Sequence, residues 1–234
     1  MEYKETGIRR IVTAGLLLAI TLLLVFTRIG MIPVPTPAAN ATIAHIPAIL
    51  GGILEGPLVG LIVGVGFGLA SFMSASVPMF KDPLVAILPR LFIGITSSWA
   101  YVLLRRANRR TLTIMLVVLF LLMLVFSTQV MNSIRWLGIT LAIISTVSAG
   151  ALYWWMRRQD VQIVGLGVTA AVGSLTNTIL VLSVAVWRGY IPTEAAWGIG
   201  LTHGIPEVIV SGIVVIAVVT ALRQIGRRQR GSRL

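Results

Sequence analysis

Polar side chains inside long apolar runs are the residues of this sequence best suited to do chemistry. Five of them fall in three separate runs: Arg90, Asn177, Thr178, His203 and Glu207. A charge at membrane depth costs ~2.5 to 3.5 kcal/mol, so such residues usually mark a binding cavity or a transport pathway. A cation together with amide donors can satisfy a carboxylate whose desolvation would otherwise oppose binding. We therefore predict a pocket for a small anionic or hydroxyl-rich ligand.

Each of these residues also has a structural interpretation. Arg90 can form an ion pair with Glu207, and Asn177 with Thr178 can hydrogen-bond between helices. His203 and Glu207, four residues apart, can relay a proton. The same pair resembles two metal ligands, but no third ligand is nearby in the sequence, so we predict neither a metal nor another cofactor.

Two segments between the apolar runs are expected to form the mouth of this pocket. Segment 28–44 is too long for a simple turn, and three prolines and Asn40 lie in it. We predict that it closes over a bound molecule, with an ordinary extended connector as the alternative. His45, just after it, contacts ligand or ends a helix. The second segment is 76–82; Lys81 and Asp82 close it and can contribute to the same mouth.

Composition determines the class of protein. The chain is 57% hydrophobic and 11% charged, whereas soluble domains carry about 25% charged residues, so a water-soluble enzyme is excluded. No nucleophile–base pair has a recognisable spacing, and we predict no enzymatic activity. Runs that can cross ~30 Å of hydrocarbon predict spans near 11–27, 42–54, 57–75, 84–104, 111–130, 137–156, 163–187 and 195–222. The thirteen-residue run 42–54 is the weakest, but the turn at Glu55-Gly56-Pro57 favours a helical hairpin with the next run. We predict an all-α, polytopic membrane helical bundle of about eight spans in a single integral membrane domain, 1–234.

The distribution of charge predicts the orientation. Nineteen Lys and Arg residues against seven Asp and Glu give a net charge of +12. Arginine clusters start the chain and follow the fourth, sixth and eighth spans, so the positive-inside rule places both termini in the cytoplasm. These clusters suit the anionic lipid bilayer surface rather than nucleic acid. A signal peptide ending near Ala39 is the alternative for the first run, but its removal would reverse this pattern.

Small residues form a stripe on one predicted helix face. Gly60, Gly64 and Gly68 are four residues apart, and Gly15 with Ala19 makes a shorter stripe in the first span. Such stripes allow another helix to approach closely. The neighbour is either another span of this chain or a partner protein.

Four stretches together resemble a known family. They are ATIAHIPAILGGILEGPLVGLIVGVGFGLASF (41–72), FKDPLVAILPRLFIGI (80–95), GSLTNTILVL (173–182) and AAWGIGLTHGIPEVIV (195–210). They are similar to the membrane-embedded substrate-binding S components of energy-coupling factor (ECF) vitamin transporters. The similarity covers 9–105 and 163–222. S components usually have six spans, so 111–156 is expected to be an inserted transmembrane hairpin.

The resemblance implies a function. Such a protein lies in a prokaryotic cytoplasmic membrane and captures a vitamin from outside in a cavity covered by loops such as 28–44 and 76–82. Its first three helices dock, through surfaces like Gly15/Ala19 and the glycine stripe, on a transmembrane scaffold subunit that carries two cytoplasmic ATPases. The stretches GSLTNTILVL and GIPEVIV look most like pantothenate-type members; riboflavin, pyridoxine-type compounds, folate and cobalamin stay open. A self-sufficient proton-coupled secondary transporter, with His203 and Glu207 as proton carriers, is the alternative.

Overall fold

The computed structural model describes the backbone of residues 2–33, 40–133 and 135–231. Its helices are α1 (Glu2–Phe26), α2 (Ile46–Leu54), α3 (Pro57–Met73), the 3-10 helix η1 (Pro78–Lys81), α4 (Pro83–Ala86), α5 (Leu88–Leu104), α6 (Arg109–Ser133), α7 (Arg135–Arg158), α8 (Val161–Trp187) and α9 (Thr193–Gly231). Two short strands, β1 (Met31–Pro33) and β2 (Asn40–Thr42), complete the described elements. Within the described part, four helical segments are long and apolar enough to cross a membrane: Gly7–Phe26, Pro83–Leu104, Val161–Trp187 and Thr193–Ile225. The chain is a helical membrane protein.

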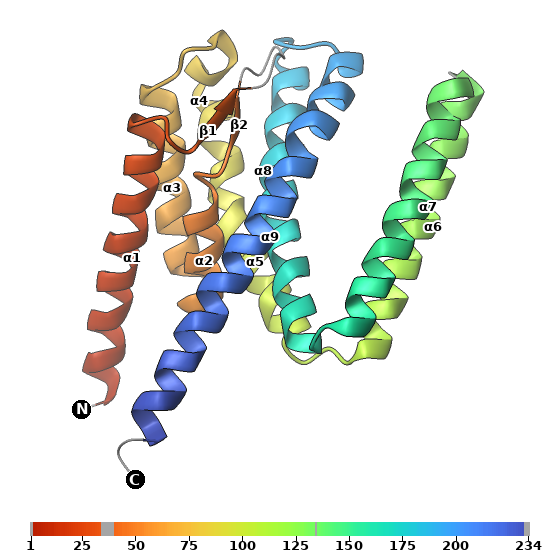
Figure 1. Cartoon of the computed structure of the whole chain (residues 1–234). Helices are drawn as coiled ribbons and strands as arrows, with labels where there is room; N and C mark the ends of the chain where they lie inside the picture. Colours follow the sequence, from red (N-terminus) through yellow and green to blue (C-terminus); the bar gives the residue numbers. More distant parts are fainter. Residues whose placement is uncertain (1, 34–39, 134, 232–234) are drawn as a thin grey trace. The chain divides into compact units, whose positions relative to one another are not determined.

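The chain divides into two compact units. The main unit comprises Met1–Val102 and Leu166–Leu234, and the hairpin unit comprises Leu103–Gly165. In the hairpin unit, α6 packs along α7 (Figure 1). In the main unit, the first turns of α1 and the last turns of α9 lie at one end, and the two strands lie at the other (Figure 1).

The segment after α1 departs from the all-α expectation. Strands β1 and β2 pair antiparallel, with Ile32 opposite Ala41, and Ile43 N donates to Gly30 O at 2.9 Å just beyond the pair. Backbone hydrogen bonds thus tie both ends of segment 28–44 together. Ala39 and two of its three prolines, Pro35 and Pro37, lie outside the described residues.

Helix α2 is shorter than the predicted second span. Its nine residues cover about 14 Å at 1.5 Å per residue, because Thr42 belongs to β2 and His45 is the residue that precedes the helix. Gly56 then adopts a positive φ of 96°, a conformation that suits glycine. The helices α2 and α3 pack as the predicted helical hairpin.

The predicted span 84–104 is broken at Ile87 between α4 and α5. Pro89 explains the break, since it has no N–H to donate to the Val85 carbonyl four residues earlier and its ring crowds that carbonyl. Arg90 Nη1 donates to Val85 O instead, at 2.5 Å. The side chain predicted to bind ligand therefore also satisfies the helix break.

The glycine stripe of α3 packs inside the main unit. A Cβ on Gly64 would lie 2.2 Å from the Arg90 carbonyl oxygen, and one on Gly60 would lie 2.7 Å from Gly94 Cα. On Gly68 it would lie 2.9 Å from Ile87 Cα. The segment from α4 to α5 packs against this face. Of the two alternatives for the stripe, its neighbour is therefore another part of this chain, and the three glycines are not a free docking surface.

Candidate functional site

Two adjoining cavities in the main unit bring most of the predicted site residues together. Their volumes are about 70 and 50 Å³, and Asn40, Thr42, Phe80 and Arg90 line both. The second is also lined by four other predicted residues: Asn177, Thr178, His203 and Glu207. Strand β2 and helices α5, α8 and α9 therefore supply one shared polar site.

Arg90 lies at the junction of the two cavities and is only 3% exposed. Its guanidinium carbon lies 5.5 Å from the ring centroid of Phe67 and 5.1 Å from that of Phe80. Contact with aromatic faces stabilises a desolvated cation. Arg90 Nε is buried and has no hydrogen-bond partner, so a donor remains available beside the cavity.

Glu207 forms no salt bridge with Arg90, so the ion pair that was one of the two interpretations of Arg90 is not present in the structure. Its Oε1 accepts a hydrogen bond from Thr42 N at 2.7 Å, and its Oε2 accepts one from Thr178 Oγ1 at 3.0 Å. The salt bridges of the described residues are Arg9–Glu55 and Arg188–Asp82. Glu207 therefore joins β2 to α8 and α9, and no carboxylate of the described residues lies within salt-bridge distance of Arg90.

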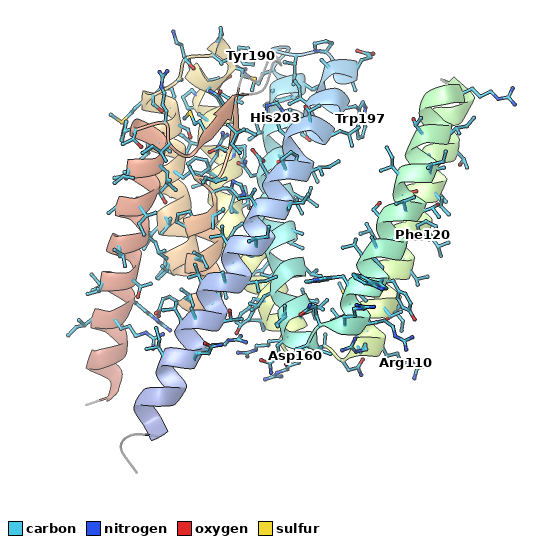
Figure 2. The ribbon with its side chains drawn as sticks, in the orientation of Figure 1. Arg110, Phe120, Asp160, Tyr190, Trp197 and His203 are labelled. Carbon is cyan, nitrogen blue, oxygen red and sulfur yellow. The ribbon has the colours of Figure 1, made fainter. Side chains whose placement is uncertain are left out.

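The remaining polar groups of the cavity come from one turn of α8 and from α9. Asn177 is 5% exposed, and its buried Oδ1 has no hydrogen-bond partner. His203 is buried, and its Nδ1 lies 3.2 Å from Thr202 Oγ1. Figure 2 shows His203 on α9 at the same end of the main unit as Tyr190. A buried polar atom without a partner is costly, so a ligand that satisfies Asn177 and Arg90 gains free energy from doing so.

His45 and Lys81 do not line either cavity. His45 is fully buried, and its Nε2 lies 2.9 Å from Ser211 Oγ on α9, one turn beyond Glu207. This is the helix-end alternative, since His45 directly precedes α2. Lys81 is exposed on η1. Lys81 is the last residue of η1, and its side chain faces outward while that of the next residue, Asp82, is buried. Lys81 therefore does not reach the cavities.

Asp82 fastens the segment beside the cavity. Its carboxylate accepts hydrogen bonds from Arg188 Nε at 2.7 Å, Tyr190 Oη at 3.3 Å and Leu84 N at 2.9 Å. The Arg188 hydrogen bond, helped by that of Leu84, holds the pKa of Asp82 below its usual value. Asp82 thus links the start of α4 to the connection between α8 and α9, next to the cavity residue Phe80.

Several lining residues were missed by the sequence reasoning. Thr42 uses its backbone, and Phe67 lies next to a glycine of the packed stripe. Their side chains look like ordinary strand and core residues. Serines at 71, 74 and 76 line the first cavity; this cluster of small polar residues after an apolar run was a signal that could have been used.

The described residues contain no group of three or more His, Cys, Asp and Glu side chains arranged to hold a metal ion. The polar groups that line the two cavities are a cation, amides, hydroxyls, an imidazole and one carboxylate. They suit recognition of an organic ligand through hydrogen bonds and charge.

Comparison with known proteins gives the family. The model for the ECF transporter substrate-specific component matches residues 9–143, which is more than half of the chain. The chain belongs to this family. It is therefore the membrane-embedded, substrate-binding S component of an ECF importer, and its family is a class of transporter subunits rather than of enzymes. No curated protein matches the chain. The matched region of the S component runs through α6 into α7 and ends before 163–222.

Proposed function

We propose that this S component binds pantothenate, or a small hydroxylated carboxylate closely similar to it, from outside the cell. The observation that carries the proposal is the buried Arg90 cation, which has one unpaired N–H beside a cavity and, among the described residues, no carboxylate within salt-bridge distance. A ligand carboxylate supplies the missing charge, and such charge-assisted hydrogen bonds are strong. Asn40, Asn177 and His203 offer partners for hydroxyl and amide groups of the same ligand.

The proposed ligand enters past the β1–β2 pair. Glu207 holds Thr42 of β2, and Asp82 holds the segment that follows η1. Both segments border the cavities. Small displacements of either would open a path to Arg90, which supports the role of segments 28–44 and 76–82 as covers.

We further propose eight spans with both termini in the cytoplasm of a prokaryotic cell. The S component would then dock on a transmembrane scaffold subunit with two cytoplasmic ATPases. Gly15 and Ala19 are exposed on α1, and a Cβ on Gly15 would meet no described atom within 4 Å. This smooth face replaces the α3 stripe as the proposed docking surface.

The decisive experiment measures ligand binding to the purified chain. We expect mass spectrometry of the copurifying small molecule to find pantothenate, and calorimetry to give submicromolar affinity. Panthenol, in which an alcohol replaces the carboxylate, is the matched control and should bind at least about tenfold more weakly, since the charged contact is worth about 1.5 to 3 kcal/mol. Equal affinity for the two compounds, or no stabilisation by pantothenate, would overturn the assignment.

The secondary-transporter alternative predicts a different result. His203 and Glu207 both line the cavity, so proton transfer between them is the specific mechanism that this alternative requires. Proteoliposomes that contain this chain alone should show no uptake driven by a pH gradient. Uptake under those conditions would show that the chain transports without ATPase partners and would contradict the proposed function.

A further inference from the structure

The hairpin unit carries a concentrated positive charge at one end. Six arginines lie at the start of α6, just before it, or at the end of α7: Arg105, Arg106, Arg109, Arg110, Arg157 and Arg158. The unit's one acidic residue is Asp160. Its carboxylate accepts a hydrogen bond from Gln162 N at 3.2 Å at the start of α8, and none of these arginines, all within the described residues, forms a salt bridge with it. Figure 2 shows Arg110 and Asp160 at this end and Phe120 farther along α6.

A cavity of about 160 Å³ lies within this end of the unit, lined by Arg109, Thr113, Tyr153, Met156 and Arg157. Arg109 Nη1 donates to Met156 O, and its Nη2 donates to Gln159 O at 2.8 Å. These carbonyls belong to the last turn of α7 and the residue after it, where no backbone N–H satisfies them. Arg109 therefore joins the two helices while its charge stays at the cavity.

Arg157 is the second cation of the cavity. Its Nη1 donates to Tyr153 Oη at 3.0 Å, and its guanidinium carbon lies 5.8 Å from the Tyr153 ring centroid. Among the described residues, no carboxylate lies within salt-bridge distance of it. The tyrosine orients the guanidinium, whose other N–H groups remain for a ligand.

The surface beside the cavity is apolar and aromatic. Exposed apolar side chains lie within two turns of the lining residues Thr113 and Tyr153 along α6 and α7: Ile114, Val117, Val118, Leu152 and Trp154. The Arg158 guanidinium carbon lies 4.1 Å from the Trp154 ring centroid. Aromatic rings of this kind favour the headgroup layer of a bilayer. An oriented cation pair next to exposed apolar side chains fits a molecule that has a phosphate and acyl chains.

We propose that the cavity between α6 and α7 binds the phosphate headgroup of an anionic phospholipid, with Arg157 and Arg109 as its cationic contacts and the acyl chains along the apolar face. Arginine forks match phosphate oxygens in geometry, and basic pockets between membrane helices are known to hold anionic headgroups. The site is separate from the pantothenate proposal, since all of its residues lie in the hairpin unit.

The test uses the full chain in detergent and short-chain phosphatidylglycerol, with bound lipid counted by native mass spectrometry. We expect Arg157→Gln to lower the affinity about fivefold, which corresponds to ~1 kcal/mol per arginine near a lipid surface. Arg110→Gln removes the same charge from the same end, but Arg110 does not line the cavity, so its effect should be under about twofold. Tyr153→Phe, which keeps the ring but releases Arg157, should lie between the two and serves if R157Q does not fold.

Three outcomes would overturn the proposal. Equal losses for R157Q and R110Q would show diffuse attraction to charge without a site. Phosphatidylcholine bound as tightly as phosphatidylglycerol would remove the requirement for an anionic headgroup. Displacement of the lipid by millimolar inorganic phosphate, in an Arg157-dependent manner, would make the cavity a site for free phosphate.

Discussion

The two units use the same polar residue types differently. In the main unit, Thr178 Oγ1 donates to Glu207 across helices, and Thr96 Oγ1 lies 3.0 Å from Thr176 Oγ1 between α5 and α8. In the hairpin unit, Thr128 Oγ1 and Thr146 Oγ1 donate to carbonyls three and four residues earlier on their own helices. The main-unit threonines also bond carbonyls of their own helices, but each reaches a second helix as well. A hydroxyl bonded only to its own helix carries no information about a neighbour. Polar residues at membrane depth therefore form a site only where several elements converge.

Glycines show the same contrast. Gly64 of α3 leaves no room for a side chain against α5, whereas a Cβ on Gly150 of α7 would meet no atom of the described chain within 4 Å. Close helix contact in the main unit places the α5 backbone, and with it Arg90, next to α3. The difference teaches that the glycines of α3 hold the site together, whereas an exposed glycine such as Gly150, or Gly15 of α1, leaves a smooth surface.

Replacing Arg90 should have the largest effect on binding. Arg90→Ala removes the proposed partner of the ligand carboxylate, and loss of one partner of a buried charge pair costs about 2 to 5 kcal/mol. We expect at least about thirtyfold weaker binding by calorimetry, on protein whose folding is checked by size exclusion. Lys81→Ala, which removes an exposed cation outside the cavities, is the matched control. Equal losses for the two variants would contradict the site.

Gly64→Ala should lower stability more than Gly150→Ala. The new methyl group would lie 2.2 Å from the Arg90 carbonyl oxygen, and overpacking of this kind costs about 1 to 3 kcal/mol. At position 150, exchange of glycine for alanine in an open helix is neutral or stabilising by up to about 1 kcal/mol. Thermal unfolding followed by tryptophan fluorescence measures both. A fall of equal size would break the contrast between the units.

Thr178→Val tests whether hydrogen bonds between elements matter to the site. It keeps the shape of the side chain but removes the donor to Glu207 Oε2, a bond to a charged group worth about 1.5 kcal/mol. We expect about tenfold weaker ligand binding. Thr146→Val, which removes only a bond to its own helix, should bind as the wild type does; an effect in the control instead would reverse the interpretation.

The smallest effect concerns Asp82 and pH. Because its folded-state pKa is lowered from the ordinary 3.8, the Arg188 interaction stabilises the protein fully above that pH and is lost as the pH falls through the lowered value. We expect Asp82→Asn to lower the melting temperature slightly and equally at pH 6 and pH 8, and the difference from wild type to shrink below pH 3.8. Arg188→Gln should lower the melting temperature at neutral pH by a similar amount. If the difference in melting temperature between Asp82→Asn and wild type grew as the pH fell, the pKa of Asp82 would be shifted in the opposite direction.

Much of the helix pattern was predictable. The ends of the predicted runs 57–75 and 163–187 agree closely with α3 and α8, since an apolar run needs only its own composition to be recognised. The break at Ile87 was readable from Pro89 but was not predicted. The β1–β2 pair depends on contacts between chain segments with no strong strand pattern of their own, so periodicity did not reveal it.

The sequence by itself determined that this chain is a membrane-embedded bundle and that Arg90, Asn177 and Glu207 are costly residues at depth. Those conclusions follow from local composition and from the free energy of placing charge in hydrocarbon. Only the tertiary structure decided which of these residues meet. In the structure, Glu207 is hydrogen-bonded to Thr42 and Thr178, Lys81 lies outside the cavities, and no carboxylate of the described residues lies within salt-bridge distance of Arg90. Helical periodicity specifies the face on which a residue lies, but the packing of separate helices specifies its neighbours.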